Sequence, residues 1–577
     1  MDISSNVKFY SLENKVLVVM EPKATFSFNG KLRIKVLYGT LEIYGSELLE
    51  NSTFVHVYSP RGHSKVVIEN VETQKELSKE NLKLLLSREG ITVDINTKLQ
   101  NDIESYTSGL AIFILMSLEN TLTNFLSTFY PVKLFPSIEN SVNYSWTDKK
   151  KAEVTLQCNF YFDKYSCKQL IYDRQAIKFI KDKMLQRIAD DKWSCSIIAG
   201  GKGVGKSTTV RFVINNILPA TNVVLVDLDP GQTECTPAGC ISFNVIKEPL
   251  LGPNFTHLIT PYYQLFVGDV NISNCAIRYL ECIKMLMDKL ASCPTLSKLP
   301  VIINTIGFCQ GIGWDIVIFV IKLFQPSLVV QIISQKKKNN FDEFLTKEVI
   351  NVQTREGHKL CQADINWSKP CNYEFQTIES YAEYHVENAT EMWNMEPYQK
   401  RELMMVAYLS KIVKNNKNIL GEKFFSNSIN AVVPYVIPFS SLYICLSRSL
   451  VPISRVFSVL NGNIVALCGV DENTLPPIKD SDSRNPVILI RQPLGTCYGF
   501  GIVRGVDMEK AELYIITALS KSVMQSVNCL MGCIPIPKTI LKMDIPHTPY
   551  TGENATLPTS REHRRGYFRM KYQNKST

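Results

Sequence analysis

Eight residues from Gly200 to Ser207 have the types and spacing of a phosphate-binding loop. They read Gly-Gly-Lys-Gly-Val-Gly-Lys-Ser and fit the pattern G-x-x-x-x-G-K-[ST]. An apolar segment, residues 196–199, precedes them, and an amphipathic segment that stops at Pro219 follows. A strand, a glycine-rich loop and a helix in this order are the setting in which such a loop holds nucleotide phosphates.

Each residue type in the loop has a chemical task. The glycines let the backbone come close to phosphate oxygens, Lys206 is expected between the β- and γ-phosphates, and the Ser207 hydroxyl is expected to ligate Mg²⁺. Lys202 is either a further γ-phosphate contact or a solvated loop lysine. The predicted ATP-binding residues are Gly200, Gly201, Lys202, Gly203, Val204, Gly205, Lys206, Ser207 and Thr208.

An acidic pair ends the next apolar segment. Residues 223–226 lead into Asp227-Leu228-Asp229-Pro230-Gly231-Gln232, and Asp227 lies 21 positions after Lys206. A P-loop site needs a carboxylate on a neighbouring strand for Mg²⁺ or its waters, and one Asp suffices for that. The second Asp lies where it could activate an acceptor hydroxyl; the alternative is a polar turn that closes the strand.

The elements around these motifs predict an α/β fold with a central P-loop NTPase domain, in which helices flank a parallel sheet, between β-rich N- and C-terminal domains. From about residue 172, apolar strands alternate with helical segments, which favours a parallel sheet. Before and after this region, short β-branched segments alternate with glycine or proline. The predicted boundaries are 1–168 (β-rich), 169–415 (P-loop domain), 416–553 (β-rich) and 554–577 (basic flexible tail).

Some individual elements follow from this pattern and others do not. Residues 26–28, 31–37 and 41–44 are expected to be separate short strands of an antiparallel sandwich or barrel. Residues 455–460 are expected to form a strand of the C-terminal domain. Residues 111–129 could be a helix or a buried strand, and the pattern does not decide between them.

Composition excludes several classes of protein. The chain has 577 residues, of which 45% are hydrophobic and 20% are charged, so it can bury real cores. No uninterrupted apolar run reaches the roughly 18 residues of a membrane-spanning helix, and the first 20 residues lack the pattern of a secretory signal. The 16 cysteines show no zinc-ligand spacing, which is typical of a reducing compartment.

The last 17 residues account for more than half of the net positive charge. Six basic residues and one glutamate give this segment a charge of +5, out of +9 for the whole chain, and three aromatic residues are interleaved. Basic groups release counterions from phosphates, and rings stack on bases, so RNA contact is one interpretation. A solvated tail or an import signal is the other.

At this point the sequence resembles a known family. Asp227–Gln232 looks like the D-x-D-x-G-Q motif of the polynucleotide 5′-hydroxyl kinases of RNA processing. Residues 236–242 are similar to that family's T-x-G-x-x-S clasp, with one extra residue before the glycine, and residues 304–308 resemble its N-T-x-G-W block, with Phe308 in place of Trp. Residues 399–402 and 499–507 resemble the nucleolar, ribosomal-RNA branch. The resemblance covers about residues 25–545.

The resemblance implies an ATP- and Mg²⁺-dependent transfer of phosphate to the 5′-hydroxyl of RNA. It also implies work in the nucleolus of the nucleus, in ribosomal RNA spacer processing, beside an endoribonuclease subunit and with no membrane partner. Lys400 and Arg401 would form a cationic lid, or else an exposed helix face. The implied catalytic residues are Lys206, Asp229, Asp227 and Arg401, the metal ligands Ser207 and Asp227, and the RNA-binding residues Gln232, Thr236, Gly239 and Phe308.

Two other readings stay open. One is a P-loop ATPase or GTPase of the partitioning or metal-delivery type, but the signature lysine of the partitioning class lies five positions before the second lysine, where this chain has Gly201. The other is a non-catalytic RNA-processing scaffold, which would be expected to lose Lys206, Ser207 or an Asp. A kinase and a scaffold role can coexist.

Overall fold

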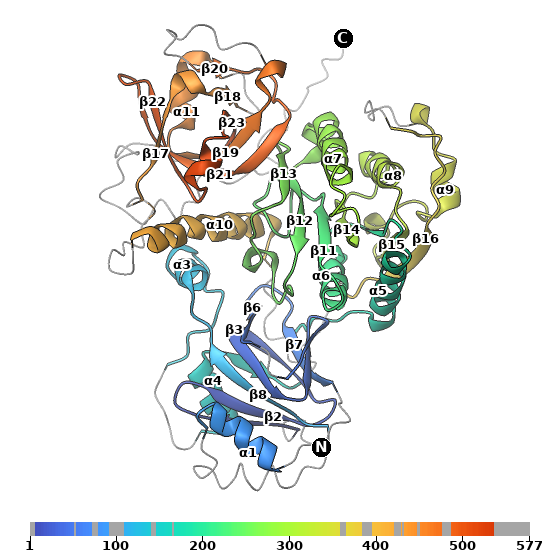
Figure 1. Cartoon of the computed structure of the whole chain (residues 1–577), viewed down its shortest axis with the longest axis vertical. Coiled ribbons are helices and arrows are strands. Elements are labelled where there is room, and N and C mark those ends of the chain that lie inside the picture. The colour runs from blue at the N-terminus through green and yellow to red at the C-terminus, as the bar shows by residue number, and fades with distance from the viewer. Residues whose placement is uncertain are drawn as a thin grey trace, which may run out of the picture. The chain divides into compact units, whose positions relative to one another are not determined.

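The computed structural model describes residues 6–50, 53–71, 79–91, 109–139, 146–163, 167–357, 365–382, 395–420, 429, 432–446, 451–475 and 486–535. The chain divides into two compact units, which we describe one by one (Figure 1). The first comprises the described parts of Met1–Ser127 and Val132–Met404, and the second those of Thr128–Pro131 and Met405–Thr577. The four predicted domain ranges stay a prediction, and the predicted tail, 554–577, lies outside the described residues.

The N-terminal part of the first unit is an antiparallel β-sheet, as the sequence predicts. The strand order is β1-β2-β8-β3-β7-β4-β5, and β6 and β9 also pair with β3. The strands are β1 (Val7–Ser11), β2 (Val16–Met20), β3 (Thr25–Tyr38), β4 (Thr40–Ile43), β5 (Ser46–Leu48), β6 (Val55–Ser59), β7 (Val66–Val71), β8 (Ala111–Ser117) and β9 (Asn159–Tyr161). Among the described residues, the helices α1 (Lys79–Arg88), α3 (Thr121–Phe129) and α4 (Asp148–Leu156) accompany them.

Two details differ from the expectations. Strand β3 runs unbroken through Gly30, where the sequence suggested two strands; Gly30 is needed there because a Cβ would lie 2.2 Å from the Cys158 sulfur. The undecided segment 111–129 contains both candidates, since β8 is followed by α3. The first half of the segment is a strand because it is buried and pairs with β2 and β3.

The central sheet is parallel over five strands and gains an antiparallel edge. Its order is β16-β15-β10-β14-β11-β12-β13, and β12 and β13 pair antiparallel to their neighbours. The sequence predicted the parallel part but not this edge. The strands are β10 (Cys195–Ala199), β11 (Val223–Asp227), β12 (Cys240–Ile246), β13 (Tyr263–Phe266), β14 (Val301–Asn304), β15 (Leu328–Ile333) and β16 (Glu374–Glu379).

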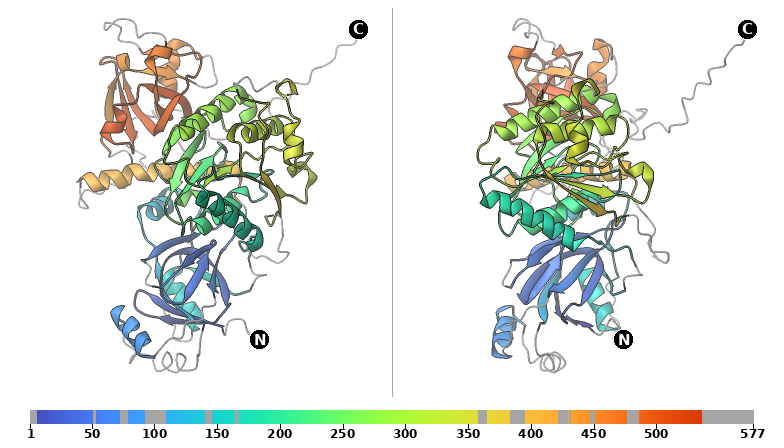
Figure 2. Two further views of the ribbon diagram at one scale, coloured as in Figure 1. Left: turned by 45° about the vertical axis from the view of Figure 1, so that its right-hand side comes forward. Right: turned by 90° about the vertical axis from the view of Figure 1, so that its right-hand side faces the viewer.

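Helices cover both faces of this sheet, as predicted (Figure 2). They are α5 (Arg174–Ala189), α6 (Lys206–Ile217), α7 (Ala276–Ala291) and α8 (Ile312–Phe324), with the short α9 (Lys347–Asn351) after β15. Neighbouring residues of β10 point to opposite faces: Ile198 packs in the core that contains α5 and α6, and Ile197 in the core that contains α7 and α8. The carboxyl ends of the parallel strands therefore stay open at one edge.

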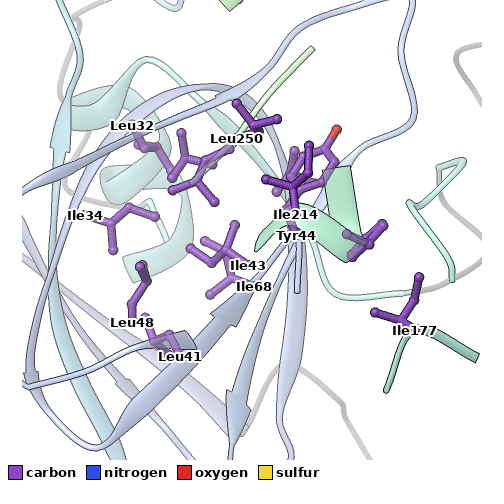
Figure 3. Packing of buried hydrophobic residues seen from close by; sticks show 14 of the residues in the cluster. Leu32, Ile34, Leu41, Ile43, Tyr44, Leu48, Ile68, Ile177, Ile214 and Leu250 are labelled. Carbon is purple, nitrogen blue, oxygen red and sulfur yellow. The ribbon is translucent and has the colours of Figure 1, made fainter. Parts of the chain in front are cut away.

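The first core is continuous from the β-rich part into the P-loop part of the first unit. Ile43 and Tyr44 from the N-terminal sheet share it with Ile177 of α5 and Ile214 of α6 (Figure 3). A hydrogen bond also connects the two parts: the Asn215 side-chain amide of α6 donates to the Tyr44 carbonyl of the N-terminal part at 2.9 Å. Helix α6, which follows the phosphate-binding loop, is thus fixed against the N-terminal sheet.

The second unit is β-rich, as predicted. Its strands are β17 (Tyr435–Pro438), β18 (Tyr443–Cys445), β19 (Asn463–Val470), β20 (Val487–Ile488), β21 (Gly495–Asp507), β22 (Glu512–Thr517) and β23 (Cys529–Pro535), with a short helix α12 (Lys521–Met524). The predicted strand at 455–460 is wrong, because residues Val456–Leu460 form helix α11. Val456 and Leu460 lie one helical turn apart, and both are buried.

Helix α10 (Pro397–Leu420) contributes its first residues, up to Met404, to the first unit and continues in the second. Among the helices that the structure describes, none combines the length and the apolar character needed to cross a membrane.

Candidate nucleotide and acceptor site

A cavity of about 320 Å³ lies at the carboxyl ends of the parallel strands. Most of its wall comes from five segments of the first unit: the loop after β10 with the start of α6, the loop after β11, the loop after β14, the β6–β7 loop and the start of α10. Residues after β12, β13 and β16 complete it. Ligand sites of parallel α/β sheets form at this edge, because the loops that follow the strands meet there. The lining includes Lys202, Lys206, Ser207, Asp229, Gln232 and Phe308.

The loop after β10 bends tightly around the amino group of Lys206. Gly203 and Gly205 have φ angles of 76° and 106°, in the left-handed region that favours glycine, and Lys206 begins α6. The Lys206 Nζ donates to the Gly201 carbonyl at 2.7 Å, and its side chain is buried. Burial lowers the pKa of Lys206, while the nearby Asp229 carboxylate opposes that shift. The ammonium is thus held at the helix N-terminus, where phosphate oxygens would bind.

Two glycines bring other loops into direct contact with this loop. A Cβ at Gly201 would lie 2.2 Å from the Asn339 carbonyl oxygen, and a Cβ at Gly307 would lie 3.0 Å from the Lys202 Cα. The loop after β15 and the loop after β14 therefore pack on the phosphate-binding loop at backbone distance. Phe308, which is 40% exposed, follows Gly307 and lines the cavity.

The two acidic residues after β11 lie in different environments. Asp227 is 1% exposed; its Oδ1 accepts from the Asn304 amide at 3.0 Å, and its Oδ2 from the Glu234 backbone N–H at 2.6 Å. Burial raises the pKa of Asp227 to about 7, although these hydrogen bonds oppose the shift. Asp229 instead lines the cavity, and its Oδ1 caps the turn by accepting from the backbone N–H groups of Gly231 and Gln232.

Cationic groups surround the rest of the cavity. Lys202, Lys400 and Arg401 line it together with His63 of the β6–β7 loop. Burial lowers the pKa of Lys400, and the positive charges of Arg211 and Lys168 add to this effect. Such an excess of positive charge over the acidic groups suits a ligand with several phosphates.

The predicted site residues fall into two groups. Those that line the cavity are Lys202, Gly203, Gly205, Lys206, Ser207, Thr208, Asp229, Gln232, Phe308 and Arg401. Those that do not are Gly200, Gly201, Val204, Asp227, Thr236 and Gly239. Thr236 is buried, and Gly239 lies in a turn where a Cβ would come 3.2 Å from the Phe266 ring. All the assigned roles, including RNA contact by Thr236 and Gly239, stay predictions.

Several residues that line the cavity are not among the predicted site residues. His63 comes from a domain far away along the chain. Arg211 and Glu234 also line the cavity and are joined to His257 in a buried cluster. The charge of Arg211, within the otherwise apolar run 210–214 of α6, is the sign of this cluster that the sequence offers.

Mg²⁺ fits the chemistry of the groups at this site. The Ser207 hydroxyl and the Asp229 carboxylate are hard oxygen donors, and both line the same cavity. Mg²⁺ is usually held by one or two such protein groups together with phosphates and water, not by a cage of side chains. Accordingly, no group of three or more His, Cys, Asp or Glu side chains placed to bind a metal occurs among the described residues.

The site therefore has the construction of a P-loop phosphotransferase, and the comparisons narrow this class. Residues 4–161 match the family model of the N-terminal domain of polynucleotide 5′-hydroxyl-kinase NOL9. Residues 200–381 match the P-loop model of the mRNA cleavage and polyadenylation factor CLP1, and residues 430–537 the NOL9-like C-terminal domain. The chain is therefore similar to polynucleotide 5′-hydroxyl-kinase NOL9 in its N- and C-terminal parts and to CLP1 in its P-loop part.

Curated relatives agree with this similarity. The polynucleotide 5′-hydroxyl-kinase NOL9 of Danio rerio is 29% identical over 542 residues, which cover 92% of this chain and 73% of the relative. The Homo sapiens protein of the same name is 26% identical over 557 residues, covering 92% and 75%. Among solved structures, the structure of a Clp1p–Pcf11p complex matches over 90% of this chain and 98% of the solved chain, with 14% identity and a TM-score of 0.48.

Proposed function

We propose that this protein transfers the γ-phosphate of ATP to the 5′-hydroxyl end of RNA. One observation supports this most: a single cavity is lined by a phosphate-binding lysine and hydroxyl, Lys206 and Ser207, and by the carboxylate of Asp229. A P-loop site needs one carboxylate for Mg²⁺ or its waters, and this chain has two, Asp227 and Asp229, after β11. A carboxylate facing the same cavity can also receive the proton of an acceptor hydroxyl.

At the nucleotide end, the loop and the first turn of α6 hold the phosphates. Lys206 neutralises charge between the β- and γ-phosphates, and Ser207 and Thr208 offer hydroxyls at the helix N-terminus. Bound Mg²⁺ would neutralise charge on the phosphate oxygens. Arg401 and Lys400, from the start of α10, are placed to add positive charge over the γ-phosphate.

At the acceptor end, Asp229 orients the RNA 5′-hydroxyl and accepts its proton. The hydroxyl oxygen forms a bond to the γ-phosphorus while the bond to the bridging oxygen of ADP breaks, and the proton passes from Asp229 to solvent. Gln232 hydrogen-bonds the RNA end, and Phe308 stacks on the terminal base, a contact worth about 1–3 kcal/mol. Asp227, enclosed by its three donors, holds the loop that carries Asp229.

We further propose that the substrate is a ribosomal RNA spacer fragment in the nucleolus, made by an endoribonuclease that leaves a 5′-hydroxyl. The name of the relatives supports this setting. An endonuclease product of this kind is the class of RNA that a 5′-hydroxyl kinase can use, since a 5′-phosphorylated end offers no acceptor hydroxyl.

The test is incubation of the purified protein with γ-labelled ATP and two matched RNAs, one with a 5′-hydroxyl and one with a 5′-phosphate. Label should enter the first RNA alone. Asp229→Asn should lower turnover far more than it weakens ATP binding. Asp269→Asn is the matched control, because Asp269 caps a turn after β13 in the same way but does not line the cavity.

Three outcomes would contradict the proposal. ATP hydrolysis without labelling of RNA would favour the ATPase alternative. ATP binding with neither hydrolysis nor transfer would favour the scaffold. Loss of ATP binding in Asp229→Asn at unchanged turnover would leave Asp229 a nucleotide or metal residue alone, with no role at the acceptor hydroxyl.

A further inference from the structure

A buried ionic cluster at the wall of the cavity joins three segments: helix α6, the loop after β11 and the segment that contains His257. Arg211 of α6 donates from Nε and Nη2 to the two carboxylate oxygens of Glu234, at 2.7 and 2.8 Å. His257 lies 3.0 Å from the same carboxylate through its Nδ1. The side chains of Glu234, His257 and Arg211 are only 2%, 8% and 11% exposed. A bidentate pair of this geometry fixes the distance and angle between its two partners.

The cluster is connected to both halves of the proposed reaction. Arg211 lies on the same helix as Lys206 and Ser207, so it moves with the phosphate-binding groups. Glu234 lies five residues after Asp229, and its backbone N–H donates to Asp227 Oδ2 at 2.6 Å. The pair is therefore a direct link between the helix that holds the phosphates and the loop that carries the acceptor carboxylate.

A third segment, residues 254–257, contacts the loop that carries Glu234. The Asn254 side-chain amide donates to the Thr233 carbonyl at 2.8 Å, next to Glu234. The His257 backbone N–H in turn donates to the Asn254 carbonyl at 2.9 Å. The short segment that contains Asn254 and His257 thus contacts the loop twice, through the Asn254 amide and through the His257 imidazole.

The charges within the cluster are matched. Burial acts to raise the pKa of Glu234, but Arg211 and His257 outweigh it and hold that pKa at about 2. Burial lowers the pKa of His257, which keeps the imidazole neutral near pH 7. One carboxylate thus faces one guanidinium, and the cluster adds no net charge to the cavity.

The donors of Arg211 are directed at protein groups. Two of its nitrogens bond Glu234, and it also hydrogen-bonds the Tyr44 hydroxyl of the N-terminal sheet. Both Arg211 and Glu234 line the cavity, yet these contacts turn their polar atoms toward one another. Direct phosphate binding by Arg211 would require it to break this buried bidentate pair, which would leave the carboxylate of Glu234 with His257 alone.

We propose that Arg211 and Glu234 are positioning residues for phosphoryl transfer, which fix the acceptor carboxylate of Asp229 relative to the phosphates held by Lys206 and Ser207. This inference rests on the proposed function. Phosphoryl transfer depends on the alignment of donor and acceptor more than on covalent help from the protein. A loosened link should slow the transfer step while each substrate still binds.

The experiment separates positioning from mere stability. In the double variant Arg211→Met/Glu234→Met, two apolar side chains of similar size replace the buried pair, a change that often leaves stability unaltered or improves it. We expect the thermal midpoint to stay close to that of the wild type. We expect kcat for transfer to fall at least tenfold, with the KM values for ATP and RNA changed less than threefold. A wild-type kcat in the folded double variant would overturn the inference.

A second variant keeps the test decisive if the double variant does not fold. Arg211→Lys keeps the charge but loses the bidentate geometry. It should lower kcat about three- to tenfold at unchanged KM, and wild-type kcat in this variant would equally overturn the inference. The matched control is Lys35→Met/Glu89→Met, which removes a partly buried pair with an N–O distance of 2.6 Å in the N-terminal sheet region and should leave kcat unchanged.

Failure of this inference is distinguishable from failure of the proposed function. If the wild-type protein labels no 5′-hydroxyl RNA, the proposed function itself is wrong. If the wild type transfers phosphate and the variants match it, only the positioning role is lost.

Discussion

The side-chain amide of Asn304 donates to Oδ1 of Asp227 at 3.0 Å, and the two residues are register partners at the ends of the parallel strands β14 and β11. Two further donors, the backbone N–H groups of Asp229 and Glu234, approach the same carboxylate. Asp227 is thus held in one orientation by the end of the neighbouring strand. The first residue of the N-T-x-G block serves the D-x-D block in this way, which links two motifs that are far apart in the sequence.

Removal of this amide should weaken both stability and catalysis. Asn304→Ala leaves a buried carboxylate with one donor fewer. Above pH 7, where Asp227 with its pKa of about 7 is ionised, a hydrogen bond to the charged group contributes about 1.5–3 kcal/mol. We expect a loss of that size in urea unfolding, together with a fall in kcat. Asn244→Ala is the control, because Asn244 is equally buried but donates to the neutral Ser242 hydroxyl on β12. It should cost about 0.5–1.5 kcal/mol and spare kcat. Equal kcat in the two variants would show that the Asn304 amide has no special link to the reaction.

Lys206→Ala should abolish transfer without unfolding the protein. The amine bonds only a loop carbonyl in the described structure, so its removal costs little packing, whereas it removes the cation between the β- and γ-phosphates. We expect a fall in kcat of at least about 100-fold, the scale on which loss of one electrostatic contact to the transition state is felt. The thermal midpoint and kcat are the measurements.

Lys322→Ala is the matched control for this lysine. Lys322 is also buried and also donates to a backbone carbonyl, that of Trp367 at 3.1 Å, but it does not line the cavity. It should lose stability and keep turnover. Wild-type turnover in folded Lys206→Ala would reject the P-loop assignment.

Local sequence signals predicted most of the P-loop part, because they act over a few residues. The apolar run before Gly200 is β10, and α6 begins at Lys206 with a left-handed glycine before it. The prediction failed where a local pattern had two physical readings. Val456 and Leu460 are apolar residues that are common in strands. In the structure they are four residues apart and both buried, which is the spacing of one face of a helix.

The parts of the site that could not be predicted depend on long-range contacts. His63 reaches the cavity from the N-terminal sheet, and Glu234 meets Arg211 across 23 positions of the chain. Apart from the charge of Arg211 in an apolar run, nothing in the types or spacing of these residues indicates such contacts. Similarly, the sequence could not divide roles between Asp227 and Asp229. The division we propose depends on which carboxylate is enclosed by backbone donors, and that is a property of the folded loop.

Gly201→Ala should disturb the site through a steric clash, not through backbone strain. Its Cβ would meet the Asn339 carbonyl at 2.2 Å, and backbone atoms on both sides leave little room to adjust. We expect a loss of about 1–3 kcal/mol in stability, the usual cost of overpacking, and a raised KM for ATP. Gly505→Ala is the control, since its nearest neighbour, Tyr514 Cδ2, would be 3.6 Å away. An unchanged KM for ATP in Gly201→Ala would contradict the close packing of this loop.

Deletion of residues 561–577, which lie outside the described residues, tests the RNA interpretation of the basic segment. If these residues contact RNA, fewer counterions are released on binding after the deletion, so affinity should fall and the salt dependence should flatten. Turnover at saturating RNA should change little. Binding measured at several salt concentrations distinguishes the interpretations: an unchanged affinity and slope would leave an import signal or a solvated tail.

His63 should make the folded protein less stable in mild acid. Burial lowers the pKa of this imidazole to about 3, and the nearby charges of Lys400, Arg211 and Lys65 act in the same direction. The unfolded chain binds a proton near pH 6.5, while the folded chain does not. The free energy of unfolding therefore falls as the pH drops from about 6.5 toward 3, by at most about 1.4 kcal/mol per pH unit from this group.

The comparison of wild type with His63→Asn isolates this contribution. Urea unfolding midpoints should be measured at pH 7.5, 6.5, 5.8 and 5. Above pH 6.5 the difference between the two proteins should be constant, because His63 is neutral in both states. Between pH 6.5 and 5 the wild type should lose up to about 2 kcal/mol more than the variant. His56→Asn is the control, since His56 is exposed and should contribute a smaller slope. Parallel curves for wild type and His63→Asn over this range would mean that His63 is free to take up a proton in the folded protein, and that the cations around the cavity do not act on it.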